Sequence, residues 1–356
     1  MALRVSGGPS LGSWARLGVL LTPILKREQT TLRALSGRSF ALDGNIELHQ
    51  FLAIIRKPDG TLFTDNTGRV TSHLIGLLTR TSTFITEYKM KPVFVFDGRP
   101  NPLKWRVIEA RREARRKAEA EYSEAASKGD YSTAWSKAVM TGRVTREVLE
   151  DAKRLLGLMG IPWLEALEDA EAQASYIAGR GDVWAVGSKD YDSLLFGTPI
   201  LARYLTITGK EYLPAQRRVR PLIPELIKLS ENLKLLSLTR EQLVDIAILM
   251  GTDFNPGVKG IGPKKALNLI RKHGAIEEIP SDVRSSLDFD VDQVCEVFLH
   301  PKIIESYNLK ASKPDVAGIE DFLCGERAFS QDRVRPVAER LAKAYSHQDR
   351  GLKEWL

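Results

Sequence analysis

The sequence predicts an α/β fold with a central, mainly parallel sheet. Two short apolar runs, residues 39–42 and 91–96, are separated by helical patterns, and each run ends in Asp-Gly. Continuous apolar runs of this kind are typical of parallel strands that helices cover on both faces. The strand-helix-strand order also favours parallel pairing, because a crossover helix returns the chain to the same end of the sheet.

The remaining elements follow from local patterns. Apolar spacing predicts helices over residues 46–55 and 72–88, with a turn-rich loop at 57–69. One or two long helices are expected within 100–150, followed by a helix over 145–159 and short strands at 161–164 and 183–186. Residues 200–209 and the basic segment Arg217, Arg218 and Arg220 are expected to form edge strands and a hairpin. Most of the chain from residue 238 to 346 has a helical pattern.

Composition narrows the class of protein. The 356 residues, 43% of them hydrophobic, are enough for a sizeable core, and no apolar run approaches the roughly 20 residues that cross a bilayer. The net charge of +7 leans modestly towards a polyanionic partner. Cys295 and Cys324 provide neither a disulfide framework nor a zinc site, and we expect two buried thiols in a reducing compartment. A targeting segment is disfavoured because Pro23 interrupts the N-terminal apolar run.

Acidic residues mark the ends of the predicted strands. Because carboxyl ends of parallel strands meet at one edge of a sheet, we expect the acids there to lie together, although one Asp-Gly alone is typical of a turn. If residues 190–192 are extended, both of their acids point to the same face. The expected group consists of Asp43, Asp97, Glu171, Asp190, Asp192 and either Asp169 or Glu168, with Asp253 as a seventh member.

This set of acids favours a particular chemistry. Carboxylate-rich sites without His or Cys suit Mg²⁺ or Mn²⁺. Two such ions, about 4 Å apart, promote phosphodiester hydrolysis. A nucleotide-binding protein is disfavoured because the sequence has neither a P-loop nor a GxGxxG motif after its first strand.

Basic residues flank the predicted acidic edge. Between residues 104 and 117, seven basic residues stand against two acidic ones, Glu109 and Glu113, a balance of 7 − 2 = +5. A solvated helix face is the plain interpretation, but the one-sided charge favours a phosphate-binding arm. Further on, Gly257, Gly260 and Gly262 precede a helix that starts with Pro-Lys-Lys, which predicts a grip on backbone phosphates. The basic residues are Lys104, Arg106, Arg111, Arg112, Arg115, Arg116 and Lys117, with Lys264 and Lys265 at the second site.

Several long motifs together resemble one family. They are FALDGNIELHQFL, TSHLIGLLTRT, KPVFVFDGRPNPLK, LLGLMGIPWLEALEDAEAQASYIA, SKDYDSLLFG, LTITGK, ILMGTDFNPGVKGIGPKKAL and FLCGERAFS. Over residues 17–356 the chain resembles the archaeal-type flap endonucleases of the structure-specific 5′ nuclease superfamily. The resemblance implies a PIN-like α/β nuclease core with a helical arch. It also implies a helix-hairpin-helix module of the helix-two-turn-helix type, which grips duplex DNA and binds K⁺ in relatives.

The resemblance also implies roles for individual residues. Lys104 and Arg111 fall on arch residues that contact the scissile phosphate, with Arg112 and Arg115 beside them. His49 replaces a tyrosine that stacks on a base, and its ring would carry a pH-dependent charge. The metal carboxylates fall on Asp43, Asp97, Glu171, Asp190, Asp192 and Asp253. The slot of the remaining acid, usually Glu, holds Asp169 with Glu168 beside it.

The implied activity is hydrolysis near the base of a 5′ flap, with 5′-3′ exonuclease activity, in lagging-strand maturation and DNA repair. Two Mg²⁺ ions, for which Mn²⁺ can substitute, would serve the reaction. The implied location is the nucleoid of an archaeal cytoplasm, or the nucleus in a eukaryote. We expect a monomer that binds DNA with a 5′ flap or a nick and also binds a sliding clamp. We expect no association with a membrane. The clamp would bind the tail through Leu352, Trp355 and Leu356, with Asp349 in a slot that usually holds Gln.

The expected division of the chain follows the same resemblance. It consists of a surplus leader (1–16), an N-terminal nuclease region (17–115), the rest of the arch (116–142), an internal nuclease region with the hairpin (143–275), a C-terminal helical region (276–346) and the clamp-binding tail (347–356). Because the family's start aligns with Leu17-Gly18-Val19, we expect translation to begin at position 17.

Two other functions compete with a flap endonuclease. The first is a DNA- and clamp-binding scaffold whose metal site has decayed, which the intact acidic residues disfavour. The second is a related nuclease that prefers gaps, bubbles or junctions, which the compact arch disfavours.

Overall fold

The computed structural model describes residues 19–206, 209–213 and 218–353. Its strands are β1 (Glu28–Gln29), β2 (Ser39–Asp43), β3 (Lys91–Phe96), β4 (Trp163–Glu165), β5 (Ala185–Gly187), β6 (Ile200–Arg203), β7 (Gly209–Leu213), β8 (Arg218–Leu222) and β9 (Glu225–Lys228). Seven strands form one sheet in the order β1-β9-β6-β5-β2-β3-β4. The pairs from β6 to β4 are parallel, whereas β9 is antiparallel to both neighbours. The sheet is therefore mainly parallel, as predicted.

Helices make up most of the rest of the chain. In the first half they are η2 (Arg33–Leu35), α1 (Gly44–Ile54), α2 (Ser72–Gly76), η3 (Leu77–Thr81), α3 (Ser82–Thr86), η4 (Pro102–Lys104), α4 (Trp105–Ser127), α5 (Tyr131–Thr141), α6 (Arg146–Leu158) and α7 (Ala170–Gly179). In the second half they are α8 (Asp192–Leu195), α9 (Leu229–Leu236), α10 (Arg240–Met250), α11 (Pro263–His273), η6 (Ile276–Glu278), α12 (Ser281–Arg284), α13 (Val291–Leu299), α14 (Val316–Glu320), η7 (Asp321–Glu326) and α15 (Gln331–Lys353). The helix predicted over 72–88 is continuous, with a π-helical turn, η3, in its middle.

The sheet is buried on both faces because successive side chains of a strand point in opposite directions. In β2, Phe40 and Leu42 join one apolar cluster with α1, α2 and α6. Ala41 joins a second cluster with α7, α8 and α10 on the other face. This double burial explains why β2 and β3 have continuous apolar sequences rather than alternating ones.

The segment directly after β5 is not extended, and the edge position expected for residues 200–203 is wrong. Residues 190–192 are not extended, because Tyr191 has helical backbone angles and Asp192 begins α8. Strand β6 is not at an edge, since it lies between β5 and β9. A hairpin does form, but it pairs β7 with β8 in a separate two-stranded sheet, so residues 200–203 take no part in it. Arg217 lies outside the described residues.

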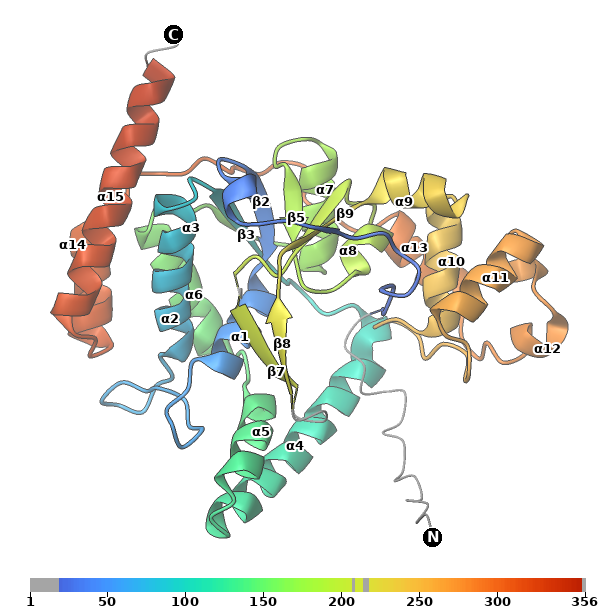
Figure 1. Cartoon of the computed structure of the whole chain (residues 1–356), viewed down its shortest axis with the longest axis horizontal. Helices are drawn as coiled ribbons and strands as arrows, with labels where there is room; N and C mark the ends of the chain where they lie inside the picture. The colour runs from blue at the N-terminus through green and yellow to red at the C-terminus, as the bar shows by residue number, and fades with distance from the viewer. Residues whose placement is uncertain (1–18, 207–208, 214–217, 354–356) are drawn as a thin grey trace.

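The predicted arch consists of α4 and α5, which lie side by side and project away from the sheet (Figure 1). An ion pair between Lys137 and Glu121 joins the two helices. At its foot, α5 packs on the loop at Gly60, where an added Cβ would lie only 3.2 Å from the Cβ of Ala138. Gly60 also has a φ of +85°, so a larger residue there would be strained as well as crowded.

A helical module follows the sheet in the sequence and lies on the side of the sheet opposite α14 and α15 (Figure 1). Helix α10 begins with a capping box in which the side chains of Thr239 and Gln242 each accept a backbone N–H. The chain then turns at Gly251 and Gly257, whose backbones are in close contact. A Cβ on Gly257 would lie 2.3 Å from the nitrogen of Gly251, so only glycine fits. Helix α11 starts at the end of this hairpin.

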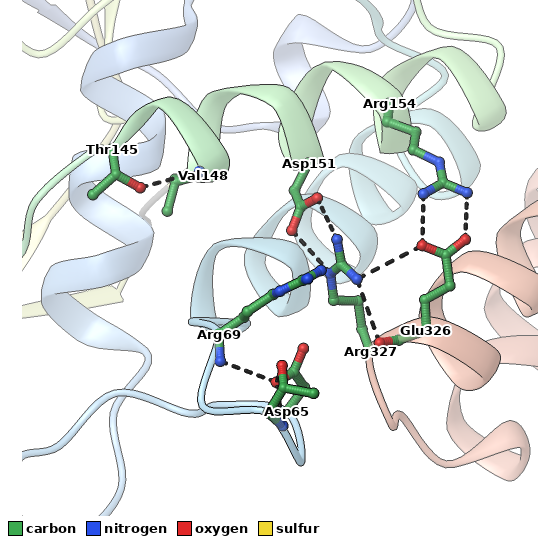
Figure 2. A network of polar contacts seen from close by, with 9 residues as sticks. Asp65, Arg69, Thr145, Val148, Asp151, Arg154, Glu326 and Arg327 are labelled. Atoms are coloured by element: carbon green, nitrogen blue, oxygen red, sulfur yellow. Dashed lines mark hydrogen bonds and ion pairs between the residues drawn. The ribbon is translucent and has the colours of Figure 1, made fainter.

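Charged contacts attach the C-terminal helices to α6 (Figure 2). The Arg327 guanidinium donates to both carboxylate oxygens of Asp151, at 3.0 and 2.7 Å. Arg154 forms a matching two-pronged pair with Glu326, at 2.7 and 2.5 Å. The Arg327 side chain is only 7% exposed, so this pair is shielded from water. Bidentate arginine–carboxylate pairs of this kind hold the turn after η7 in one orientation.

Two further expectations concern the chain as a whole. Within the described ranges, no helix combines the length and the apolar character that crossing a bilayer requires. Cys295 and Cys324 are free thiols that are half-buried rather than fully buried. Burial raises the pKa of the Cys295 thiol to about 12.

The Arg327–Asp151 pair provides a test of this packing. Arg327→Met leaves Asp151 largely buried without its cation, so we expect the free energy of unfolding to fall by about 2 to 3 kcal/mol. The matched control is Arg335→Met, which removes a largely exposed arginine and should cost less than about 1 kcal/mol. Chemical denaturation measures both. Equal losses of unfolding free energy in the two variants would contradict the structural role of the buried Arg327–Asp151 pair.

Candidate metal centre and nucleic-acid interface

Two of the predicted acids lie at the ends of adjacent parallel strands. Asp43 ends β2, and its carboxylate accepts the Ile46 N–H at 2.8 Å, which caps α1. Asp97 follows β3, and its carboxylate accepts the Ala170 N–H at the start of α7, at 2.9 Å. The side chain of Asn45 accepts the Asp97 N–H at 3.1 Å. The two acids therefore sit where α1, β3 and α7 meet.

Contacts at the start of α7 distinguish Asp169 from Glu168, the two acids between which the sequence does not choose. Asp169 is the N-cap residue of α7, and its carboxylate contacts the ammonium of Lys104. Glu168 turns to other partners: it accepts from Lys302 at 2.7 Å and from Asn101 at 3.0 Å. Only Asp169 thus lies on the side of the arch lysine.

Glu171 and the acids after β5 are joined by serine hydroxyls. Ser188 and Ser193 lie 3.1 and 3.3 Å from one Glu171 oxygen. Ser188 also accepts the Asp190 N–H, at 3.2 Å. Asp192 accepts the Val19 N–H at 3.0 Å, so the first described residue of the chain lies at the site.

Asp253 enters the site from the hairpin side. Both of its oxygens accept hydrogen bonds from Arg111 of α4, at 2.9 and 2.7 Å. Next to it, the ring of Phe254 lies beneath the Lys104 ammonium, at 4.9 Å. The arch and the hairpin module therefore meet at the acidic edge of the sheet.

Burial and mutual repulsion dominate the electrostatics. Burial raises the pKa of Asp43, and the charges of Asp97 and Asp190 raise it further. The same causes, with Asp192 as the strongest neighbour, raise the pKa of Glu171. For Asp192, burial and the charge of Asp253 raise the pKa to about 7. In each case burial is the largest cause, and repulsion by neighbouring carboxylates adds to it.

Two arch residues supply positive charge. Burial alone would lower the pKa of Lys104, but the charges of Asp169 and Asp97 outweigh it and raise the pKa. Even so, burial keeps the pKa of Asp169 raised despite the contact with Lys104. Lys104 and Arg111, even with Lys189 and Arg203 acting on Asp190, are fewer than the seven carboxylates, which leaves room for a further cation.

The chemical type of the candidate ligands suits a hard divalent ion. All of the candidate groups are carboxylates, which Mg²⁺ and Mn²⁺ prefer. As the side chains of the described residues lie, no three acidic, imidazole or thiol groups are gathered tightly enough to hold one ion. Lys104 and Arg111 instead contact Asp169 and Asp253 directly.

Glu47 is a buried acid of this region that sequence reasoning missed. It is 4% exposed, and burial raises its pKa to about 7, although Thr206 and Lys189 oppose the shift. Glu47 follows Asp43 by four residues, one helical turn, and its charge acts on Asp43. That spacing on α1 was the signal that could have revealed it.

His49 is a residue of α1 that remains partly exposed to solvent. Partial desolvation of its ring and the charges of Lys189, Arg115 and Arg111 lower its pKa to about 4. The ring is therefore neutral around neutral pH, and its charge changes only in acid. The pH-dependent charge expected from the sequence is thus moved well below the physiological range.

The basic residues of η4 and α4 differ in how far they are exposed to solvent. Lys104, Arg111 and Arg115 are half-buried, as their spacing of seven and four residues on one helix face predicts. Arg112 is exposed, and so are Lys264 and Lys265 at the start of α11. The Lys265 ammonium donates to the Gly260 carbonyl at 3.1 Å, which ties the first turn of α11 to the hairpin. Gly260 has a φ of +81°, whereas Gly262 is the N-cap of α11.

Residues at both ends of the chain fall outside the described part of the structure. The leader (1–16), the start at Leu17, and Trp355 and Leu356 of the expected clamp-binding tail fall outside the described residues. The backbone at Leu352 belongs to the last turn of α15.

Two family models match this chain. The XPG N-terminal domain matches residues 17–118, and the XPG I-region matches residues 160–253. Together they include β2, β3, α7 and the segment that ends at Asp253.

Individual relatives match over nearly their whole length. Flap endonuclease 1 of Staphylothermus marinus is 44% identical over 349 residues, which cover 95% of this chain and 99% of that protein. Flap endonuclease 1 of Pyrococcus abyssi is 47% identical over 329 residues, covering 92% and 95%.

A solved structure, flap endonuclease-1 from Methanococcus jannaschii, is similar in fold, with a TM-score of 0.74. It is 38% identical and covers 93% of this chain and all of that one. Sequence and fold agree over the same span, and the chain belongs to the flap endonuclease 1 family of XPG nucleases.

Proposed function

We propose that this nuclease hydrolyses DNA at the base of 5′ flaps, with 5′-3′ exonuclease activity, in a reaction that uses two divalent ions. The main support for this proposal is that acids from β2, β3, α7, the segment after β5 and the hairpin converge. These acids share one edge of the sheet with Lys104 and Arg111. Full-length similarity to flap endonuclease 1 proteins supports the substrate.

The ions are Mg²⁺ in this proposal, and Mn²⁺ can substitute. When bound, they would supply a nucleophilic hydroxide and stabilise the leaving oxygen. Their ligands would come from Asp43, Asp97, Asp169, Glu171, Asp190, Asp192 and Asp253. The contact of Asp169 with Lys104, and the different partners of Glu168, favour Asp169 over Glu168.

Lys104 and Arg111 act on the DNA in this scheme. Their charges lie against Asp169 and Asp253, so both cations are already held at the acidic edge. There they can neutralise a phosphodiester that would otherwise be repelled by the carboxylates. The Phe254 ring beneath the Lys104 ammonium limits the directions in which this lysine can move.

Residues further from the acids would bind the rest of the DNA. Arg112 and Arg115 extend the basic arch, and the neutral ring of His49 suits stacking on a base. On the other flank, Gly257, Gly260, Gly262, Lys264 and Lys265 would grip a duplex backbone, with K⁺ bound at the hairpin.

Several wider assignments belong to this proposal. A sliding clamp would bind the tail through Leu352, Trp355 and Leu356, and the protein would act as a monomer in replication and repair of an archaeal chromosome, in the cytoplasm. The division into regions 17–115, 116–142, 143–275 and 276–346, with the leader and the tail at the ends, is part of the same proposal.

Cleavage of labelled DNA tests the function directly. With Mg²⁺ present, we expect double-flap DNA to be cut faster than gapped, bubble or four-way substrates. Asp190→Ala should lower the rate by about a hundredfold or more while the DNA still binds. Asp245→Asn is the control, because Asp245 is a buried acid of α10 outside the site. Preference for four-way DNA, or cutting by Asp190→Ala, would contradict the proposal.

Metal binding should depend on pH. With an Asp192 pKa of about 7, the folded state holds a proton that the unfolded chain, with an ordinary Asp pKa of about 4, releases. Without metal, stability therefore falls as the pH rises from about 4 to about 7. Because protons compete with metal, Mg²⁺ should raise the melting temperature more at about pH 8 than at about pH 5.

The Asp192→Asn variant should weaken this difference, and Asp245→Asn should preserve it. A melting temperature that does not respond to Mg²⁺ at either pH would contradict the metal site.

The hairpin lysines should bind DNA without regard to sequence. Replacing Lys264 and Lys265 by Met should weaken binding to every duplex and reduce the slope of log K against log salt by about one to two. Lys272→Met, at the opposite end of α11, is the control and should change little. Fluorescence anisotropy at several salt concentrations measures the slope. An effect limited to particular sequences would contradict a phosphate grip.

A further inference from the structure

Glu168 precedes Asp169 directly, yet it belongs to a different set of contacts. Its side chain is 17% exposed, and its two carboxylate oxygens have separate partners. One accepts from the Lys302 ammonium at 2.7 Å, and the other accepts from the Asn101 side chain at 3.0 Å. Glu168 therefore bridges two segments that are about 200 residues apart in the sequence.

Asn101 controls the turn that carries Lys104. While its amide nitrogen donates to Glu168, its amide oxygen accepts the Leu103 N–H at 3.0 Å and caps η4. The Lys104 N–H donates to the Asn101 carbonyl, also at 3.0 Å. A shift of Asn101 would thus move the backbone from which Lys104 extends.

The backbone around Glu168 supports the same turn. The Gly98 N–H donates to the Glu168 carbonyl at 2.7 Å, and the Arg99 N–H donates to the Leu167 carbonyl at 3.0 Å. The segment from 98 to 104 is therefore held along residues 167–169 from its beginning. The Glu168–Asn101 hydrogen bond is the side-chain contact that continues this attachment to the start of η4.

Lys302 ties the bridge to the hairpin module. It lies three residues after α13, on a segment that runs along α7. Gln173 of α7 both donates to and accepts from Ile304, at 2.9 and 2.6 Å, which holds this segment in register. At the other end, Phe298 of α13 packs on Phe254, with ring centroids 5.1 Å apart. Lys302 is therefore anchored on both sides.

We propose that Glu168 is a positioning residue that holds the turn of Lys104 in place by bridging Asn101 to Lys302, and that it is not a metal ligand. This inference rests on the proposed function in one respect, namely that Lys104 acts on the DNA. The bridge links the base of the arch to the hairpin module, so it couples the two parts of the protein that would hold the DNA. Small displacements matter here, because an error of about 1 Å in a positioned group can cost about a hundredfold in rate.

The two halves of the bridge differ in strength. Lys302 is 72% exposed, so its ion pair is screened by water and contributes little alone. The hydrogen bond to Asn101 carries the positioning. Glu168→Gln can keep an oxygen towards Asn101 while it loses the ion pair, so it should resemble Lys302→Met. Glu168→Ala removes both contacts.

Hydrogen exchange tests the bridge without DNA or metal. In the full-length protein, Glu168→Ala should speed exchange of the amides at 98–104 by about fivefold to tenfold, because the turn loses a hydrogen-bonded support. Glu168→Gln and Lys302→Met should change it by about twofold or less. Glu305→Ala and Lys310→Met, two exposed positions of the same segment, are the controls and should have no effect. Unchanged exchange in Glu168→Ala overturns the proposal.

Single-turnover cleavage of double-flap DNA then separates positioning from metal binding. We expect Glu168→Ala to cut about tenfold more slowly, with unchanged DNA affinity and an unchanged Mg²⁺ concentration at half-maximal rate. Glu168→Gln should stay within about threefold of the wild type. A raised Mg²⁺ requirement, or loss of activity in Glu168→Gln, would make Glu168 a ligand and overturn the proposal. A wild type that does not cut flaps would overturn the proposed function instead, while the exchange experiment would still decide the bridge.

Discussion

Crowded negative charge at one edge of a buried sheet is the constraint on which the rest of the structure depends. Burial, together with repulsion among carboxylates from β2, β3, α7, the segment after β5 and the hairpin, raises several of their pKa values. A folded chain tolerates such a group only if its surroundings supply opposing charge or hydrogen bonds. Here Lys104 and Arg111, at the base and on the first helix of the arch, supply part of the opposing charge, and Lys189 and Arg203 act on Asp190.

The fold provides hydrogen bonds to most of these acids. Asp43 and Asp97 accept backbone N–H groups at the starts of α1 and α7, where helix dipoles favour negative charge. Asp192 accepts the Val19 N–H, and serine hydroxyls flank Glu171. The acids are thus held in place by groups that remain available when the net charge of the site changes. Such preorganisation is what a site needs if a cation and a polyanion are to enter it.

The same edge also joins three parts of the molecule. The arch reaches it through Lys104 and Arg111, and the hairpin module reaches it through Asp253 and Phe254. The bridge from Asn101 through Glu168 to Lys302 runs beside these contacts and connects the same two parts. The C-terminal helices are attached separately, on α6, by the paired forks of Arg327 and Arg154 (Figure 2). Stability and site geometry therefore depend largely on different ion pairs.

The fold class could be predicted from the sequence, because the apolar runs at β2 and β3 and the helical periods between them are local patterns. Most acids of this edge could also be predicted from the sequence, since Asp43, Asp97 and Asp190 end or follow strands and Asp169 and Asp192 stand at helix starts. The directions in which those side chains turn depend on tertiary contacts. Asp169 and Glu168 are adjacent and similar in chemistry, and contacts with residues about 65 and 134 positions away separate them. The helical turn at Asp192, the buried Glu47 and the low pKa of His49 likewise depend on packing between distant segments, which local sequence patterns do not encode.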